Sequence, residues 1–327
     1  MSADWKPSAA PAAIRLRAAL YAQIRAYFAA RDVLEVETPV LSQAGVTDIH
    51  IAPFHLEFSG RTEGAPRRRW LRTSPEYAMK RLLAAGIGDC YELGRVFRDG
   101  EAGGRHNPEF TMLEWYRVGW DHHRLMEETV AVVQAALGLV GRSARHVATF
   151  TYRDLYREQL GLDPFDAPTE GLMAALGDVL IDPEGLTRDD WLDLLMTHRI
   201  QPAFARDAIT LIHDYPASQS ALAKLRDDGD GLPVAERFEL YLGPLELANG
   251  YHELRDAGEQ ALRFRRDVAF RRERDGDAPP LDERLLQALD HGLPACAGVA
   301  LGIDRLLMAM LETPRIADVL AFDFARA

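Results

Sequence analysis

The chain has 327 residues, enough for one large domain or two ordinary ones. Hydrophobic residues make up 47% and charged residues 27%, a globular composition that excludes disorder over most of the chain. Asp and Glu number 50 against 38 Lys and Arg, and the net charge of −12 argues against broad electrostatic binding to nucleic acid. Two cysteines, Cys90 and Cys296, exclude a disulfide framework and favour a reducing compartment. Without a long apolar run, the sequence predicts a cytoplasmic protein that has no transmembrane helix.

The N-terminal part of the chain alternates helical and strand signals. Residues 1–13 are rich in Ala and Pro and are expected to form a flexible tail rather than a signal peptide. Apolar side chains recur at helical spacing over residues 14–30 and predict an amphipathic helix, which the short β-prone run 33–36 follows. Ser74, with Pro and Glu directly after it, predicts the start of a helix that runs to about residue 85.

The middle of the chain contains a strand pair and then a helical segment. Residues 90–98 and 110–118 are predicted to form a hairpin around a polar loop that holds three glycines. Residues from about 121 to 210 are interpreted as a mostly helical insertion. Strand-like runs return at 209–212 and 237–247.

The C-terminal part ends in a compact strand and helix. Residues 258–274 predict a charged helix, and the Pro-rich stretch 275–280 predicts a loop. Residues 296–301 predict a buried strand, and 303–311 a final helix. Hairpin-linked strands interrupted by helices predict an α+β fold with an antiparallel sheet rather than alternating βαβ units.

The predicted hairpin carries the first group of residues that could do chemistry. Side chains alternate between the faces of a strand, so every second residue shares a face. One face would combine Glu92, Gly94, Val96 and Arg98 with Phe110, Met112, Glu114 and Tyr116. An arginine, carboxylates, a phenol and an aromatic ring would then converge. The alternative is a half-buried hairpin whose charges lie on a solvated face.

Glu239, Glu246 and Glu253 form a second group. Glu246 lies in an apolar run, where a carboxylate is costly to bury unless it is paired or binds a cation. Glu239 and Glu246 can approach each other where the strand bends at Gly243-Pro244, and such oxygen ligands suit Mg²⁺ that bridges nucleotide phosphates. A surface acidic strand is the alternative interpretation.

The third group is the small-residue run 298–305, which ends in Arg305. Small residues allow a strand to pass close to a ligand, although plain core packing explains them equally well. The sequence contains no phosphate-binding loop of the G-x-x-x-x-G-K type and no His/Cys metal-ligand spacing. His106, His213 and His252 are therefore interpreted as ordinary polar or core histidines.

Three motifs in chain order resemble those of class II lysyl-tRNA synthetases. Residues 35–41 resemble motif 1, residues 94–117 motif 2 and residues 298–305 motif 3. Residues 238–254 are similar to the segment of that family that binds Mg²⁺ and lysine. The resemblance covers nearly the whole chain from about Ile14 and implies a class II synthetase-like catalytic domain over residues 14–327.

Motif 1 begins close to the start of the chain, so no anticodon-binding domain is expected. The resemblance is therefore closest to the elongation factor P lysine ligase family, stand-alone paralogues that attach lysine, preferably (R)-β-lysine, to a lysine of elongation factor P. It implies ATP and Mg²⁺ as cofactors, lysine or β-lysine as substrate, a homodimer, and no tRNA or membrane partner. Aminoacylation of tRNA and an inactive amino-acid-sensing paralogue are the alternative functions.

The resemblance also implies roles for individual residues. Arg98 and Arg305 would be catalytic, and Glu239 with Glu246 would hold the metal. ATP binding is implied for Arg98, Asp99, Gly100, Asn107, Phe110, Glu246, Leu247, Gly302 and Arg305. Binding of the substrate amino acid is implied for Ser74, Pro75, Glu76, Tyr116, Glu253 and Ala300.

The chain departs from the family pattern at two positions. The motif 2 glutamate is displaced by one residue, so Glu101 receives no role. Ala300 replaces a glycine of motif 3, and its methyl group would encroach on the amino-acid pocket. We interpret Ala300 as a sign of an altered amino-acid substrate, with neutral packing as the alternative.

Overall fold

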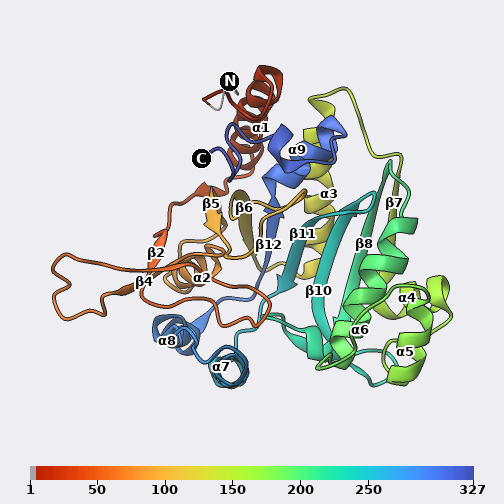
Figure 1. The fold of residues 1–327 in the computed structure, drawn as a ribbon. Helices are drawn as coiled ribbons and strands as arrows, with labels where there is room; N and C mark the ends of the chain where they lie inside the picture. Colours follow the sequence, from red (N-terminus) through yellow and green to blue (C-terminus); the bar gives the residue numbers. More distant parts are fainter. Residues whose placement is uncertain (1–4) are drawn as a thin grey trace. The chain divides into compact units, whose positions relative to one another are not determined.

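The computed structural model describes residues 5–327, and the chain divides into two compact units. Unit 1 comprises the described residues up to Trp120 together with Leu254–Ala327, and unit 2 comprises Asp121–Glu253. Figure 1 follows the chain through both units. The predicted insertion at about 121–210 lies in unit 2, and the predicted domain boundaries stay a prediction.

Unit 1 is built on strands that pair mainly antiparallel. In order across the sheet these are β1 (Leu34–Glu35), β5 (Cys90–Phe97), β6 (Glu109–Val118) and β12 (Cys296–Gly302). The pairs β5–β6 and β6–β12 are antiparallel, whereas β1 pairs with β5 in parallel. A smaller sheet has the order β2 (Leu41–Ser42), β4 (Arg68–Leu71), β3 (His55–Glu57).

The helices of unit 1 come from both ends of the chain. They are α1 (Pro11–Ala29), α2 (Glu76–Ala84), α7 (Ala257–Asp275), α8 (Glu283–Gly292) and α9 (Ile303–Leu311). Figure 1 shows α1 beside α9, near both chain ends. Arg17 of α1 pairs with the buried carboxylate of Asp304 in α9, and Asp304 also accepts the Thr111 N–H of β6 at 2.7 Å. The ion pair thus ties the start of α9 to α1, and the hydrogen bond ties it, with Arg305, to β6.

The strands of unit 2 are hydrogen-bonded neighbours. In order these are β11 (Leu245–His252), β10 (Pro233–Leu242), β8 (Ala208–Pro216) and β7 (His146–Thr151), and β9 (Leu225–Asp227) also pairs with β10. All of these pairs are antiparallel except β7–β8, which is parallel. The helices are α3 (His122–Gly138), α4 (Tyr152–Leu160), α5 (Thr169–Leu176) and α6 (Arg188–Leu195), and a π-helical turn η1 (Met196–Ile200) follows α6.

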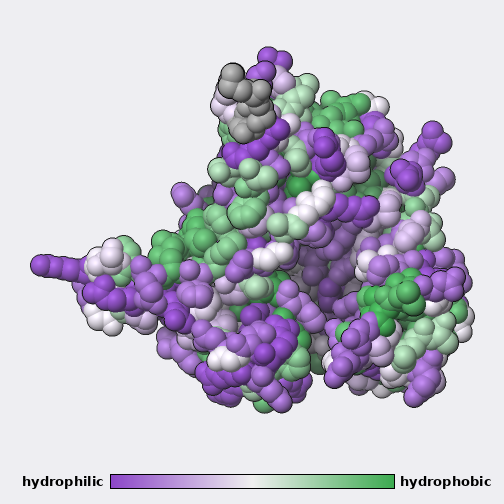
Figure 2. All heavy atoms as spheres, viewed as in Figure 1, coloured by the Kyte–Doolittle hydropathy of each residue, from purple (hydrophilic) through white to green (hydrophobic). Residues whose placement is uncertain are grey.

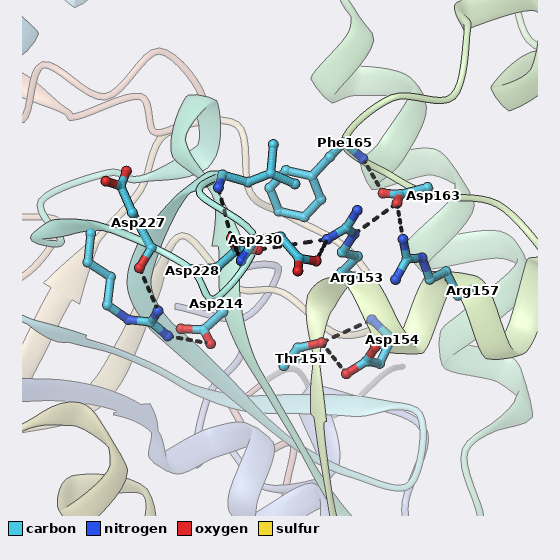
Figure 3. A network of polar contacts seen from close by, with 12 residues as sticks. Thr151, Arg153, Asp154, Arg157, Asp163, Phe165, Asp214, Asp227, Asp228 and Asp230 are labelled. Carbon is cyan, nitrogen blue, oxygen red and sulfur yellow. Dashed lines mark hydrogen bonds and ion pairs between the residues drawn. The ribbon is translucent and has the colours of Figure 1, made fainter.

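Helices pack on both faces of the unit 2 sheet. Helix α3 contacts β10 and β11, and Figure 1 shows it behind these strands, with α6 in front of β8. The second face is covered by a core in which residues of α4–α6 pack with Ile212, Tyr215 and Tyr241. In Figure 3, Arg153 of α4 reaches both the Asp163 loop, at 2.8 Å, and Asp230 of the β9–β10 turn, at 2.7 Å.

The predicted strand 237–247 is wrong in one respect, because the chain reverses within it. Gly243 and Pro244 connect β10 to β11, and Leu242 is paired with Leu245. Gly243 has φ 55°, and a Cβ at this position would lie 3.1 Å from Cα of Arg206. A glycine with positive φ at the first turn position is typical of a tight hairpin turn, which a pattern of apolar residues does not reveal.

The other predicted helices and strands are confirmed, with shifted ends. Helix α1 begins at Pro11 rather than at residue 14, and Ser8 and Ala9 donate backbone hydrogen bonds to the C-terminal segment, so residues 8–13 are not a flexible tail. Residues 1–4 of the predicted tail lie outside the described residues. The predicted helical segment also contains β7, and sequence patterns missed α8.

Polar side chains predominate on the face drawn in Figure 2, as expected from the charged composition. Within residues 5–327, no helix combines the length and apolarity that crossing a bilayer requires. Cys90 and Cys296 are both buried as free thiols.

Candidate active site

The predicted shared face of the β5–β6 hairpin is confirmed. Glu92 lies opposite Glu114, Gly94 opposite Met112 and Val96 opposite Phe110, so these side chains are on one face. Arg98 follows directly after β5, and its N–H donates to the Pro108 carbonyl at 2.9 Å. Phe110 and Glu114 are four residues apart on β6, a distance of about 13 Å along the strand.

Two arginines lie at the loop end of this hairpin. The Arg98 guanidinium lies 5.1 Å from the centre of the Phe110 ring, and its Nη1 is 3.5 Å from Oε1 of Glu101. Nε of Arg98 is buried and has no hydrogen-bond partner among the described residues. Nη2 of Arg305 is 2.7 Å from Nε2 of His106, whose pKa is lowered by burial and by the Arg305 charge. This end of the hairpin therefore presents cationic groups beside an aromatic ring, a combination suited to an anion attached to a planar base.

The loop between the strands is held at several points. Gly100 has φ 77°, and its N–H donates to the Asp99 carboxylate at 2.8 Å. The Asn107 side chain donates to the Glu109 carbonyl at 2.7 Å and accepts the Phe324 N–H at 2.9 Å. In the structure Asn107 thus braces the loop, and its predicted contact with a nucleotide stays a prediction.

Farther along the same face lies a cluster of buried acidic and hydroxyl groups. Glu114 accepts hydrogen bonds from Ser74 Oγ at 2.6 Å and from Tyr116 OH at 2.8 Å. Glu76 accepts from the buried Lys80 ammonium at 2.6 Å. Burial and the nearby Glu76 charge raise the pKa of Glu114 to about 8 and outweigh the two hydroxyl donors. Such a pocket would bind an amine, whose positive charge would restore ionisation of Glu114.

Next to this cluster, Glu92 is stabilised by its own cation. The carboxylate pairs with Arg72 and accepts from Thr38 Oγ1 at 2.7 Å. Arg72 crosses β5 at Gly94, where a Cβ would overlap the guanidinium. The glycine in motif 2 is thus explained by the close approach of this arginine.

The remaining predicted residues of unit 1 lie around this face. Ala300 of β12 is directly opposite Glu114 of β6, and Gly302 is opposite Met112. Ser74, Pro75 and Glu76 line a cavity of about 190 Å³ inside unit 1. Helix α2 starts at Glu76, one residue later than predicted, and Ser74 Oγ accepts the Glu76 N–H at 2.9 Å.

Glu239 and Glu246 lie on one face of the β10–β11 hairpin in unit 2. Tyr241 lies opposite Glu246, and Glu239 is two residues from Tyr241 on the same side. The Glu239 carboxylate pairs with Arg237 and accepts from Tyr241 OH. Leu247 is buried on β11, and Glu253, also buried, follows the end of that strand. The hairpin turn places the two carboxylates on one face, and their predicted approach to a shared Mg²⁺ stays a prediction.

Glu114 was given no role in the sequence-based assignment, although the structure places it between Ser74 and Tyr116. The signal is present in the sequence, because a carboxylate between Leu113 and Trp115 is as exceptional as Glu246 between two leucines. Lys80 and Arg72, which pair with Glu76 and Glu92, gave no comparable signal.

Comparison with known families places the chain in the class II synthetases. The family described as tRNA synthetases class II (D, K and N) matches residues 2–326. The chain belongs to this family, and the predicted α+β fold with a class II catalytic domain is confirmed.

Within that family, this chain is similar over its full length to a group of ligases. It is 46% identical to the elongation factor P--(R)-beta-lysine ligase of Yersinia enterocolitica over 330 residues, covering 100% of this chain and 99% of that protein. The proteins of the same name from Proteus mirabilis and Vibrio cholerae are also 46% identical, each covered over 99% of its length.

We expect Glu114→Gln to flatten the pH dependence of stability. Between about pH 5 and pH 8 the folded chain keeps a proton on Glu114 that the unfolded chain releases, so stability falls as pH rises through this window. A neutral amide removes this contribution. Thermal melting at several pH values measures it, with Glu109→Gln, an exposed position on the same strand, as the control. Equal pH slopes in wild type and Glu114→Gln would show that Glu114 ionises normally.

Proposed function

We propose that this chain is an ATP-dependent ligase that activates (R)-β-lysine or lysine as an adenylate and transfers it to a lysine side chain of elongation factor P. The observation that carries the proposal is the full-length identity of 46% to ligases of that name. On one face of the β5–β6 hairpin, the arginines at the loop end and the buried acidic cluster farther along match the two ends of an aminoacyl-adenylate.

In the first step the substrate carboxylate attacks the α-phosphate of ATP, and pyrophosphate leaves. The carboxylate is ionised at neutral pH and needs no general base, so catalysis consists of positioning and charge neutralisation. Arg98 would hold the α-phosphate, and its buried Nε can donate to a phosphate oxygen. Phe110, beneath that guanidinium, would stack on adenine, and Arg305 would meet the terminal phosphates.

The substrate ammonium groups would bind to the acidic residues. The resemblance assigns one amine to Glu76 and the other to Tyr116 and Glu253. Glu114, which accepts a hydrogen bond from the Tyr116 hydroxyl, adds a carboxyl group to this set. Ala300, opposite Glu114, would set the space available to the amine.

Magnesium is expected at Glu239 and Glu246. Oxygen donors on one face of a hairpin fit a cation that prefers carboxylates, phosphates and water. Arg237 and Tyr241 would orient Glu239, while Glu246 would bind more directly. The ion would neutralise charge on the triphosphate.

In the second step a lysine ε-amine of the acceptor protein attacks the adenylate carbonyl, and AMP leaves. With a reference pKa of 10.4, about one such amine in 2,500 is neutral at pH 7. The acceptor amine must therefore lose a proton before it attacks.

We place the enzyme in the cytoplasm, where free thiols such as Cys90 and Cys296 stay reduced.

Pyrophosphate exchange tests the first step. Arg98→Ala should slow exchange at least about a hundredfold, the effect of losing one transition-state donor. Glu246→Ala should lose both activity and its dependence on Mg²⁺. Arg145→Ala, an exposed arginine of unit 2 outside the motifs, is the control. Near-normal exchange in both site variants would refute the assignment.

Transfer of labelled β-lysine to elongation factor P, to tRNA or to neither then separates the proposed activity from its alternatives.

Ala300→Gly should shift the choice of amino acid. α-Lysine and β-lysine differ in the position of one amine, and a methyl group in a pocket is worth about 1–3 kcal/mol, or roughly 10–200-fold in selectivity. The variant should raise kcat/KM for α-lysine relative to β-lysine by that order in the exchange assay. A change of less than about twofold would mean that Ala300 only packs against β6.

We also propose a homodimer formed through motif 1. Leu34, directly before that motif, and Leu41, its last residue, are 49% and 43% exposed in the single chain. Light scattering should give twice the chain mass at micromolar concentration, and Leu34→Asp should weaken the dimer. Leu180→Asp, at a fully exposed leucine of unit 2, should leave the mass unchanged. A monomeric wild type would contradict the proposal.

A further inference from the structure

Four histidines gather in unit 2 although no spacing in the sequence connects them. His122 and His123 begin α3, His213 lies on β8, and His252 ends β11. The strand registers place His213 and Gly250 opposite Phe238, so His213, Glu236 and His252 share one face of the sheet. Helix α3 covers that face.

This face is opposite to the one that carries the two glutamates. Glu239 is offset by one residue from Phe238, and its paired residue on β11 is Asn249, so its side chain points to the other side. The histidine cluster is thus separate from the proposed Mg²⁺ ligands.

Three of the rings lie close enough together to bind one metal ion. One ring nitrogen from each of His122, His123 and His213 lies within 4.8 Å of the others. A tetrahedral zinc ion with nitrogen ligands at 2.0–2.1 Å requires nitrogen atoms about 3.3 Å apart. Small rotations of the rings are sufficient, because His123 is exposed and His213 is only partly buried.

The second observation is that the central ring lacks partners. His122 is 2% exposed, and neither of its ring nitrogens has a hydrogen-bond partner among residues 5–327. Its Nε2 lies 3.8 Å from Oδ1 of Asp214, which is too distant for a hydrogen bond. A buried polar group in this state is costly, and a metal ion would satisfy it.

The surroundings also suit a metal ligand set. Nδ1 of His213 lies 3.1 Å from Oδ2 of Asp214, a carboxylate that Arg226 holds in place at 2.6 Å. Among the described residues Nδ1 of His213 makes no hydrogen bond, so this ring also has a nitrogen that a metal ion could satisfy.

We propose that His122, His123 and His213 bind a divalent transition metal ion such as Zn²⁺ and thereby tie the start of α3 to β8. Imidazole ligands favour zinc, copper and nickel over magnesium. A second set, His122 with Glu236 and His252, is less suitable. Glu236 already contacts His252 at 2.5 Å, and Lys224 and Arg226 lie at 3.3 and 3.5 Å from it.

The test is calorimetric titration of Zn²⁺ into the full-length, tag-free chain after chelator treatment, together with melting curves. Wild type should bind one equivalent and melt at a higher temperature with Zn²⁺. His123→Asn changes an exposed position and should weaken Zn²⁺ binding at least about tenfold. Loss of a residue that only hydrogen-bonds to a metal ligand already weakens metal binding by about tenfold or more, so loss of a ligand itself should cost at least as much. His123→Asn should also remove the zinc-dependent rise in melting temperature while the metal-free chain stays folded.

Two control variants keep the assignment falsifiable. His146→Asn removes an exposed histidine of β7, and His252→Asn removes the second set; both should bind zinc as wild type does. No binding by wild type, or equal losses in His146→Asn and His123→Asn, would overturn the site. Loss in His252→Asn with retention in His123→Asn would overturn the choice of ligands. None of these measurements depends on ligase activity, so failure of the proposed function would not affect them.

Discussion

Ionised groups buried on strands and helices are the most expensive components of this fold, and several of them have an oppositely charged partner. The pairs within unit 1 are Arg72 with Glu92, Lys80 with Glu76, and Arg17 with Asp304. In unit 2, Arg237 pairs with Glu239. Each cation in these pairs also determines where a candidate site residue lies, because a buried charge cannot leave its partner without a large loss of stability. The geometry of the site and the stability of the fold therefore rest on the same contacts.

Strand alternation separates two kinds of ion chemistry in unit 2. Glu236 and Glu239 are three residues apart on β10, an odd number, so alternation directs Glu236 to the α3 face and Glu239 to the opposite face. One face offers carboxylates, which prefer hard cations such as Mg²⁺, and the other offers imidazoles, which prefer softer ones. The proposed Mg²⁺ and Zn²⁺ ions differ in the same way, so neither set of ligands would bind the ion of the other set strongly.

The sequence predicted the parts of the fold that depend on local patterns. The β5–β6 hairpin and the faces of Glu92, Arg98 and Glu114 follow from strand alternation, and motif order placed the chain in its family. The reversal at Gly243 was not predicted, since a positive φ depends on the turn and leaves no apolar pattern. The histidine cluster was missed for another reason. His122 and His213 are far apart in the chain, and only the packing of α3 on the sheet brings them together.

Glu114 is also buried but differs from these paired acids, and the difference is informative. Its neighbours are two hydroxyl groups and the charge of Glu76, and Lys80 is already bonded to Glu76. With a pKa raised to about 8, the carboxyl group is mostly protonated at neutral pH in the chain alone. A bound ammonium would supply the missing cation and favour ionisation, as an opposite charge within a few ångströms does. Under the proposed function, binding of the amino acid would therefore release a proton, and affinity for the substrate would rise with pH until the substrate amine itself begins to lose its charge.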